Sequence, residues 1–334
     1  MRKRFPAIAT AIAAAVLVAP VSASAQGASE ALHVEAKIPL GRVKGRIDHM
    51  AVDLARGRLF VAELGNDTVA AVDIKAGKVV HVIPRLKEPQ GVGYVPSTDT
   101  LYVANAGDGS VPIYRGERYT PEVALQLGSD ADNIRFDAAT GRLLVGYGGG
   151  AIAAIDPANN RKTADMPLAG HPESFRLGGD PPRIYVNVPE AHMIAVLDPA
   201  TGKTTARWPT QGMSGNFAMA LDEKAREVIV AFRHPAKLVA FAMADGRMTA
   251  SAETCGDIDD VFVDARRQRI YASCGEGFVD VLDKASTPWR RLTRVRTVAG
   301  ARTALFVPDL DRLFVAVRAS GSEPAAIWVL RPAP

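Results

Sequence analysis

The sequence contains two cysteines among its 334 residues, and they are not in Cys-x-x-Cys spacing. A c-type haem-attachment motif is therefore absent. The chain also lacks a hydrophobic run long enough to cross a membrane, because the apolar stretch from 7 to 19 has 13 residues and a span needs about 20. Between residues 30 and 334 there is no Pro/Ser-rich linker and no low-complexity segment, which favours a single domain.

Residues 1–25 have the features of an export signal. Three basic residues at 2–4 precede the apolar stretch, and residues 23–25 (Ala-Ser-Ala) fit the small-x-small rule of signal peptidase. We therefore predict a signal peptide over 1–25, cleavage between Ala25 and Gln26, and a periplasmic mature chain without a membrane span. An uncleaved anchor helix is the alternative. No cysteine lies at the cleavage point, so a lipid anchor is not indicated.

Little net charge remains once the segment is removed. The formal charge of +4 falls to +1, because residues 1–25 carry three basic residues and no acid. A mature chain of this kind has no overall basic field for holding phosphates, which weighs against nucleic acid as a partner.

A four-residue phrase occurs seven times: a basic or polar residue, two apolar residues, and usually Val or Ala. The copies begin at Arg58, Thr100, Arg142, Arg183, Glu227, Arg269 and Arg312, at steps of 42, 42, 41, 44, 42 and 43 residues. A period of 40 to 45 residues built from short strands is typical of a β-propeller with one blade per repeat. The sequence predicts an all-β chain in which residues 26–334 form one seven-bladed propeller.

Each repeat predicts four antiparallel strands. An alternating segment that starts polar precedes the phrase, and a Gly/Asn-rich hairpin and a third strand ending in Asp follow it. Acids at the ends of strands, such as Asp53, Asp137 and Asp198, are assigned to turns. The seventh repeat stops after its third strand at 326–330, so residues 32–40 are expected to supply the outer strand of the last blade.

Several phrases resemble the YVTN-type (YncE-like) seven-bladed propellers. The similar segments include 101–105 (Leu-Tyr-Val-Ala-Asn) and 195–203, and the likeness extends over the mature chain. A WD-repeat propeller fits less well because the sequence has no Trp-Asp dipeptide. The resemblance implies an exported propeller, and some members of the family are reported to bind DNA. Propellers with similar repeats include virginiamycin B lyase and the gluconolactonase group, which hold a divalent metal in the central tunnel.

The repeat also locates a candidate site. The residues ten positions before each phrase are all polar: Asp48, Gln90, Asp132, Glu173, Asp259 and Arg302, with Asn216 eleven positions before the fifth phrase. The next position adds His49, Asn133 and Asp260. These residues open the innermost strands, so we expect them to meet at one mouth of the central tunnel and to bind a ligand there.

Four acids of this set suit a hard cation such as Ca²⁺, which prefers oxygen ligands. The metal candidates are Asp48, Asp132, Glu173 and Asp259. Two alternatives remain open: the acids form a solvated polar funnel, or they pair with arginines such as Arg302, Arg135 or Arg176. His49 and His171 lie beside acids of the set, so either is a candidate general base.

These observations favour a non-catalytic, monomeric binding or scaffold protein that holds a small ligand or a periplasmic protein at the mouth. The second hypothesis is a metal-dependent hydrolase or lyase similar to the lactonase group, and the third is DNA binding.

Cys255 precedes the inner strand of the sixth repeat and Cys274 ends the strand paired with it. In an oxidising compartment we therefore predict a disulfide, with a soft-metal or redox pair as the alternative.

Overall fold

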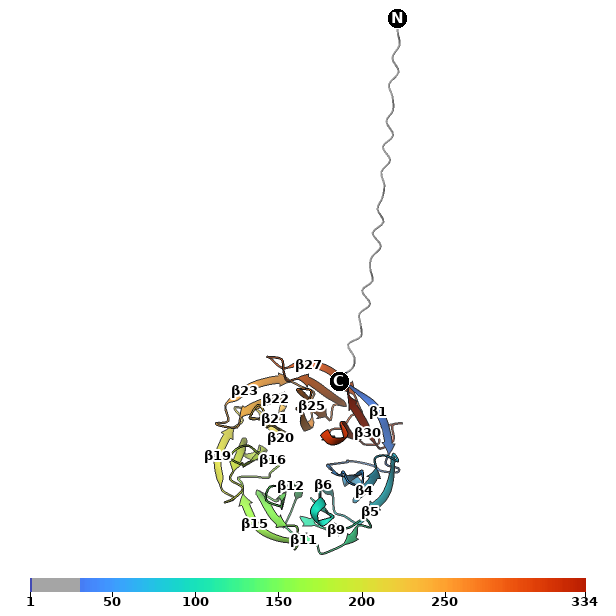
Figure 1. Ribbon diagram of the computed structural model, residues 1–334, viewed down its shortest axis with the longest axis vertical. Coiled ribbons are helices and arrows are strands. Elements are labelled where there is room, and N and C mark those ends of the chain that lie inside the picture. The colour runs from blue at the N-terminus through green and yellow to red at the C-terminus, as the bar shows by residue number, and fades with distance from the viewer. Residues whose placement is uncertain (2–30) are drawn as a thin grey trace.

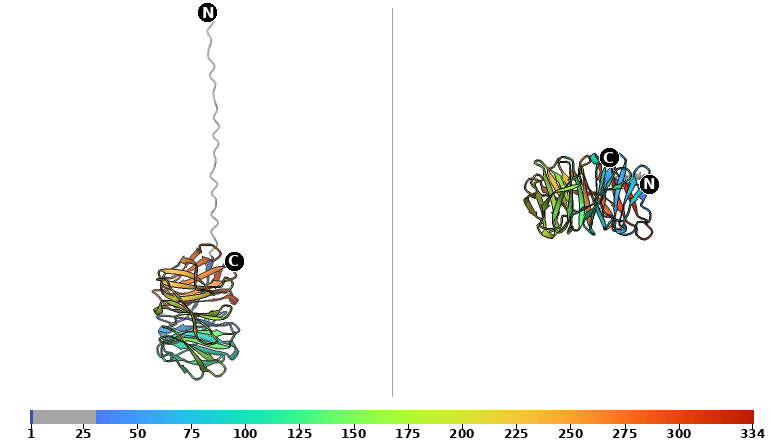
Figure 2. Two further views of the ribbon diagram at one scale, coloured as in Figure 1. Left: turned by 90° about the vertical axis from the view of Figure 1, so that its left-hand side faces the viewer. Right: turned by 90° about the horizontal axis from the view of Figure 1, so that it is seen from below.

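The computed structural model describes Met1 and residues 31–334. Seven four-stranded antiparallel sheets surround a common axis, which confirms the seven-bladed propeller (Figure 1). Seen from the side, the ring is a short, thick disc (Figure 2). The predicted signal peptide and its cleavage point lie outside the described residues, Met1 excepted. In the described part of the chain, no helix is long and apolar enough to cross a membrane.

The strands follow the repeat. Blade one contains β2 (Met50–Asp53), β3 (Arg58–Glu63), β4 (Thr68–Asp73) and β5 (Lys78–Ile83). Blade two contains β6 (Pro89–Val95), β7 (Thr100–Asn105), β9 (Ile113–Arg115) and β10 (Thr120–Pro121), beside a short pair, β8 (Ser110–Val111) and β11 (Leu125–Gln126). Blade three contains β12 (Ala131–Asp137), β13 (Arg142–Tyr147), β14 (Ala151–Asp156) and β15 (Arg161–Pro167).

The remaining blades have the same order. Blade four contains β16 (Phe175–Gly178), β17 (Arg183–Val188), β18 (Met193–Leu197) and β19 (Thr204–Pro209). Blade five contains β20 (Ser214–Asp222), β21 (Glu227–His234), β22 (Ala236–Ala242) and β23 (Met248–Glu253). Blade six contains β24 (Ile258–Asp264), β25 (Arg269–Cys274), β26 (Phe278–Asp283) and β27 (Arg290–Arg296). Blade seven contains β28 (Ala304–Val307), β29 (Arg312–Val317), β30 (Ala326–Pro332) and β1 (Leu32–Pro39).

Single-turn 3₁₀ helices occupy four of the hairpins: η1 (Leu64–Asn66), η2 (Pro96–Thr98), η3 (Pro189–Ala191) and η4 (Pro308–Leu310). Each ends on a residue in the left-handed region, such as Asp67 with φ 55°. The N-terminal strand β1 pairs antiparallel with β30, from Leu32 opposite Pro332 to Pro39 opposite Ala326. The outer strand of the last blade therefore comes from the start of the described chain (Figure 1).

The hydrophobic core is divided among the blades. Seven clusters of buried side chains lie between neighbouring blades, one at each junction. Successive residues of a strand point to opposite faces, so the repeated phrase serves two junctions at once. In β3, Leu59 and Val61 pack toward blade seven, whereas Phe60 packs toward blade two. The two apolar residues of each phrase therefore hold a blade to both of its neighbours.

The turns that the sequence predicts at strand ends are formed in most blades. The Asp residues assigned to turns accept backbone N–H groups two or three residues ahead: Asp53, Asp73, Asp137, Asp156, Asp198, Asp264 and Asp283. Blade two differs because Pro112 has no N–H to donate, and its third strand is split there into β8 and β9. The Cys255–Cys274 disulfide is confirmed, with a Cα–Cα distance of 5.8 Å.

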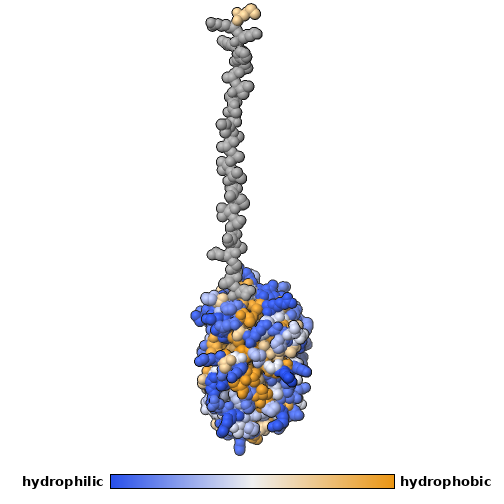
Figure 3. Space-filling view, turned by 90° about the vertical axis from the view of Figure 1, so that its right-hand side faces the viewer, coloured by the Kyte–Doolittle hydropathy of each residue, from blue (hydrophilic) through white to orange (hydrophobic). Residues whose placement is uncertain are grey.

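The outer surface near β1 and β5 is partly apolar (Figure 3). Val34 of β1 and Val80 and Val82 of β5 are exposed there.

Candidate functional site

Five of the seven predicted ring residues meet at one face of the propeller. Gln90, Asp132, Glu173, Asp259 and Arg302 line a cavity of about 310 Å³ at the end of the ring where the inner strands begin. The same cavity is lined by five further residues: Arg46, Asp130, His171, Phe217 and Arg233. The expected mouth therefore exists, with charged side chains from most of the blades.

Four mouth residues that the sequence analysis did not place in the ring share one signal. Arg46, Asp130, His171 and Asp257 each lie two residues before a member of the ring. These residues lie in the loops that lead into the inner strands, and Arg46, Asp130 and His171 line the cavity, whereas Asp257 reaches Arg302 at its edge. Arg233 has a different origin, because it lies near the mouth end of β21, the second strand of blade five.

Asn216 does not line the cavity, contrary to the expected ring. Its side chain is fully buried and donates from Nδ2 to the carbonyl oxygen of Met193 at 3.0 Å, in blade four. The pairing of β20 with β21 skips Phe217, between Asn216 and Ala218, as the pairings in blades two and six skip Gln90 and Asp259. Phe217 lies at the mouth instead, with the Arg233 guanidinium 3.9 Å from its ring centre.

Asp48 lies behind the wall of the cavity. Its side chain is fully buried and is 2.7 Å from the Arg46 guanidinium. Its backbone N–H donates to the carbonyl oxygen of Ala62, which fixes it to β3. Burial raises the pKa of Asp48 to about 7, an effect that Arg46 opposes and nearby Asp259 reinforces.

Asp259 is held between two arginines. The Arg233 guanidinium lies 2.6 Å from Asp259 Oδ1, and Arg302 Nε lies 3.2 Å from Oδ2. Arg302 also reaches Asp257 at 3.1 Å. The alternative that acids of the ring pair with arginine is therefore correct for Asp259 and Arg302.

Arg135 and Arg176 do not form such pairs among the described residues. Arg135 donates to Asn133 Oδ1 at 2.9 Å and to the carbonyl oxygen of Ile134, and Arg176 donates to the carbonyl oxygen of Phe175 at 3.0 Å. Burial lowers the pKa of Arg176 to about 9 and lowers that of Arg135 as well. These guanidiniums lie below the mouth, on the inner strands of blades three and four.

Asp132 and Glu173, on adjacent blades, have no Lys or Arg within ion-pair distance in the described chain. Asp132 is only 5% exposed, and its Oδ1 has no hydrogen-bond partner. Burial raises the pKa of Asp132 well above its ordinary range, and the charges of Asp48 and Glu173 add to the shift. Burial likewise raises the pKa of Glu173 to about 7, opposed by His171.

The backbone around these two acids is tightly fixed. The Asn133 side chain donates to the carbonyl oxygen of Glu173, and the N–H of Glu173 donates to the carbonyl oxygen of Asn187 at 3.1 Å. Gly91 of blade two approaches so closely that a Cβ there would lie 1.8 Å from the Asp132 carbonyl oxygen. Only glycine permits this contact between blades two and three.

The two candidate general bases, His49 and His171, differ in their position relative to the cavity. His49 lies beneath the cavity, with Nε2 3.8 Å from Asp48 and 3.9 Å from Asp132, and Nδ1 3.8 Å from Asp260. Burial lowers the pKa of His49. Asp260 accepts the backbone N–H of Ala304 at 2.8 Å, and burial raises its pKa to about 6.

His171 lines the cavity itself. Its Nδ1 lies 2.7 Å from the carbonyl oxygen of Gly148, and Asp130 is 3.5 Å away. A carbonyl oxygen only accepts, so Nδ1 carries the proton and Nε2 is the basic nitrogen when the ring is neutral.

The four metal candidates are not arranged as one set of ligands. Within residues 31–334 there is no group of three or more His, Cys, Asp or Glu side chains that could hold a metal ion. Arginines already pair with Asp48 and Asp259, which leaves Asp132 and Glu173 as the two carboxylates without a cationic partner. The residues present do not fit a calcium site, which needs six or more oxygen ligands.

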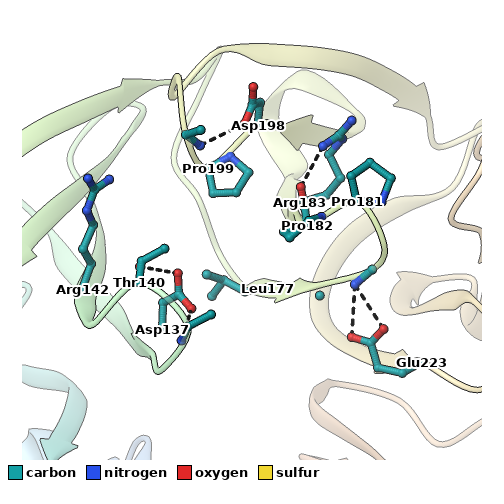
Figure 4. A pocket seen from close by; sticks show the side chains of 14 residues that line it. Asp137, Thr140, Arg142, Leu177, Pro181, Pro182, Arg183, Asp198, Pro199 and Glu223 are labelled. Atoms are coloured by element: carbon teal, nitrogen blue, oxygen red, sulfur yellow. Dashed lines mark hydrogen bonds between the residues drawn. The ribbon is translucent and has the colours of Figure 1, made fainter. Parts of the chain in front are cut away.

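A larger cavity, about 840 Å³, lies on the opposite face between blades three and four (Figure 4). The acids that line it accept hydrogen bonds from nearby residues. Asp137 accepts from the Thr140 hydroxyl, and Asp198 accepts from the N–H of Ala200. Glu223 accepts from the N–H of Gly179. The sequence analysis did not identify this cavity. Its one distinctive signal is the run at 178–182 (Gly-Gly-Asp-Pro-Pro), which replaces the short turn of other repeats.

Comparison with solved structures supports the fold. The chain is similar to a structure titled Kuenenia stuttgartiensis hydrazine synthase, with a TM-score of 0.76 and 17% identity over 87% of this chain and 97% of that one. It is also similar to a chain of a mitotic checkpoint complex, with a TM-score of 0.72 and 12% identity over 98% of this chain and 99% of that one. No family model and no curated protein matches the sequence. At these identities the likeness shows a shared β-propeller fold alone.

Proposed function

We propose that this chain is an exported, non-catalytic binding protein that holds a small polar ligand at the mouth of its propeller. The observation that carries the proposal is the cavity of about 310 Å³, in which Asp132 is buried without a cationic partner. A buried carboxylate without a partner costs stability, and such groups are concentrated at functional sites. The volume suits a small molecule better than a folded partner.

A binding role fits the side chains better than catalysis. Among the described residues that line the cavity there is one histidine, His171, and no Ser, Thr or Cys that it could activate as a nucleophile. His49 lies below the cavity, 3.8–3.9 Å from Asp48, Asp132 and Asp260, and does not line the cavity. The metal-dependent hydrolase or lyase requires a set of metal ligands, which the described residues do not provide in one group.

Export to the periplasm and membership of the YVTN-type propellers are part of the proposal. The features of residues 1–25 support a signal peptide. The disulfide supports an oxidising compartment, where such bonds persist.

The test is a thermal-shift screen of the mature chain against small cations, anions, sugars and neutral polar compounds. We expect one class of these compounds to raise the unfolding midpoint of the wild type. The control variant is Asp309→Asn, because Asp309 is an exposed acid in η4, at the end of an inner strand, and this variant should respond as the wild type does. The same class should have a much smaller effect on Asp132→Asn. The proposal is contradicted if no compound raises the unfolding midpoint of the wild type, or if a compound that does so raises that of Asp132→Asn equally.

A further inference from the structure

The charges at the mouth are unevenly compensated. Each arginine that lines the cavity already lies within ion-pair distance of an acid: Arg46 with Asp48 at 2.7 Å, Arg233 with Asp259 at 2.6 Å, and Arg302 with Asp257 at 3.1 Å. These pairs belong to blades five, six, seven and one. The acids of blades three and four that line the cavity, Asp130, Asp132 and Glu173, have no Arg or Lys within ion-pair distance among the described residues, so this side of the cavity is electronegative.

Asp132 and Glu173 are the less exposed acids of this electronegative side, since Asp130 is half exposed and lies 3.5 Å from His171. Both line the cavity, Asp132 is 95% buried, and no described side chain donates a hydrogen bond to its Oδ1. Two carboxylates that share a cavity without a counter-ion repel each other. A positive group in the cavity relieves that repulsion, whereas Asp132 Oδ1 itself is buried 3.9 Å from His49 Nε2, beneath the cavity.

We propose that the positive group is the primary ammonium of a small organic molecule, bound between the carboxylates of Asp132 and Glu173. This inference rests on the proposed binding function and names its ligand class. An ammonium donates three hydrogen bonds, and Gln90 lines the same cavity, so its amide oxygen offers a third acceptor. Hydrogen bonds between charged groups are the strong ones in such a site.

Two other kinds of cation fit less well. A hard divalent ion needs six or more oxygens, and the described residues offer no group of three potential ligands. A quaternary ammonium is recognised by open aromatic faces. Among the described residues, Phe217 is the one Phe, Tyr or Trp that lines the cavity, and the Arg233 guanidinium already lies 3.9 Å from its ring centre. The site therefore favours a cation that donates hydrogen bonds.

Arginines on either side of the two acids suit an oxygen-bearing tail. Arg46 lines the cavity at blade one, and Arg233 lines it at blade five, next to blade four, which carries Glu173. A hydroxyl or carboxylate a few atoms from the ammonium would meet these donors. Ethanolamine, which carries an ammonium and a hydroxyl, is thus a suitable probe.

The experiment is calorimetric titration of ethanolamine into the full mature chain at constant ionic strength. HEPES is the buffer, since Tris is itself a primary ammonium. We expect saturable binding with one site. Asp132→Asn and Glu173→Gln should each weaken it by roughly tenfold or more, as expected when a hydrogen bond to a charged group is lost. Asp309→Asn should bind as the wild type does, and tetramethylammonium and Ca²⁺ should not compete.

Each contrary result is informative. If the folded wild type does not bind ethanolamine, or if tetramethylammonium or Ca²⁺ binds as well, the ammonium assignment is wrong. The proposed function still stands if another class in the thermal-shift screen acts through Asp132. If Asp132→Asn does not fold, Glu173→Gln carries the test alone, and unchanged binding by that variant overturns the inference.

Discussion

Replacing Glu173 with Gln should stabilise the protein at high pH and should have little effect at low pH. The pKa of Glu173 is raised from 4.5 to about 7, chiefly by burial, while His171 and Arg233 oppose the shift and Asp259 and Asp130 add to it. A carboxyl with a raised pKa in the folded state disfavours folding once it must ionise. Below pH 4.5 the ionisation of Glu173 therefore does not change the free energy of unfolding. That free energy falls as the pH rises from 4.5 to 7.

The size of the effect follows from the shift. A difference of 2.5 pKa units at 1.36 kcal/mol each amounts to about 3 kcal/mol at pH 8. Glutamine has the same shape and no charge, so Glu173→Gln should gain about 3 kcal/mol in free energy of unfolding at pH 8, relative to its effect at pH 4.

Urea unfolding of the wild type, Glu173→Gln and Asp309→Asn at pH 4 and pH 8 measures this difference. Asp309 is exposed, so its variant controls for a change in net charge. The reasoning is refuted if Glu173→Gln is destabilising at pH 8, or if its effect does not change with pH. Either result would mean that Glu173 has a cationic partner after all.

Four further predictions concern the metal, the disulfide, the inner strands and nucleic acid. A chelator should leave the unfolding midpoint unchanged and elemental analysis should find no stoichiometric metal; a loss of stability with chelator would revive the hydrolase hypothesis. The Cys255→Ser/Cys274→Ser variant should unfold with about 3 kcal/mol less free energy, since the bond closes a loop between residues 19 apart; equal urea midpoints would contradict this. Gly91→Ala should cost about 1–3 kcal/mol and weaken ligand binding, because the added Cβ displaces the Asp132 carbonyl; a calorimetric titration that matches the wild type would contradict it. A gel-shift assay at near-physiological salt should show no DNA binding, and a salt-dependent shift would restore the third hypothesis.

Much of the fold was predictable because the repeat is a packing requirement. Every blade must bury its second strand against two neighbours, so the phrase recurs, and each copy begins the second strand of a blade, from Arg58 in β3 to Arg312 in β29. The disulfide was predictable because Cys255 and Cys274 flank paired strands. The split third strand of blade two follows from Pro112, but its position within the blade depends on the tertiary register.

The candidate site was only partly predictable. The column at Gln90, Asp132 and Glu173 was found because the repeat fixes the register at the start of each inner strand. Asn216 was misplaced because it lies eleven positions before its phrase, whereas the other ring residues lie ten positions before theirs. The residue ten positions before the fifth phrase is Phe217, which is skipped by the strand pairing as Gln90 and Asp259 are, and which lines the cavity as they do. Arg233 was missed because a long side chain reaches the mouth from a neighbouring strand.

The central claim is that the carboxylates of Asp132 and Glu173 bind a ligand at the propeller mouth. The most direct measurement is a crystal structure of the mature chain grown with ethanolamine. The account predicts density for the ligand between these two side chains, with its nitrogen within about 3 Å of both carboxylates. Ligand density in the cavity of about 840 Å³ on the opposite face, or only an arginine side chain filling the mouth, would contradict it.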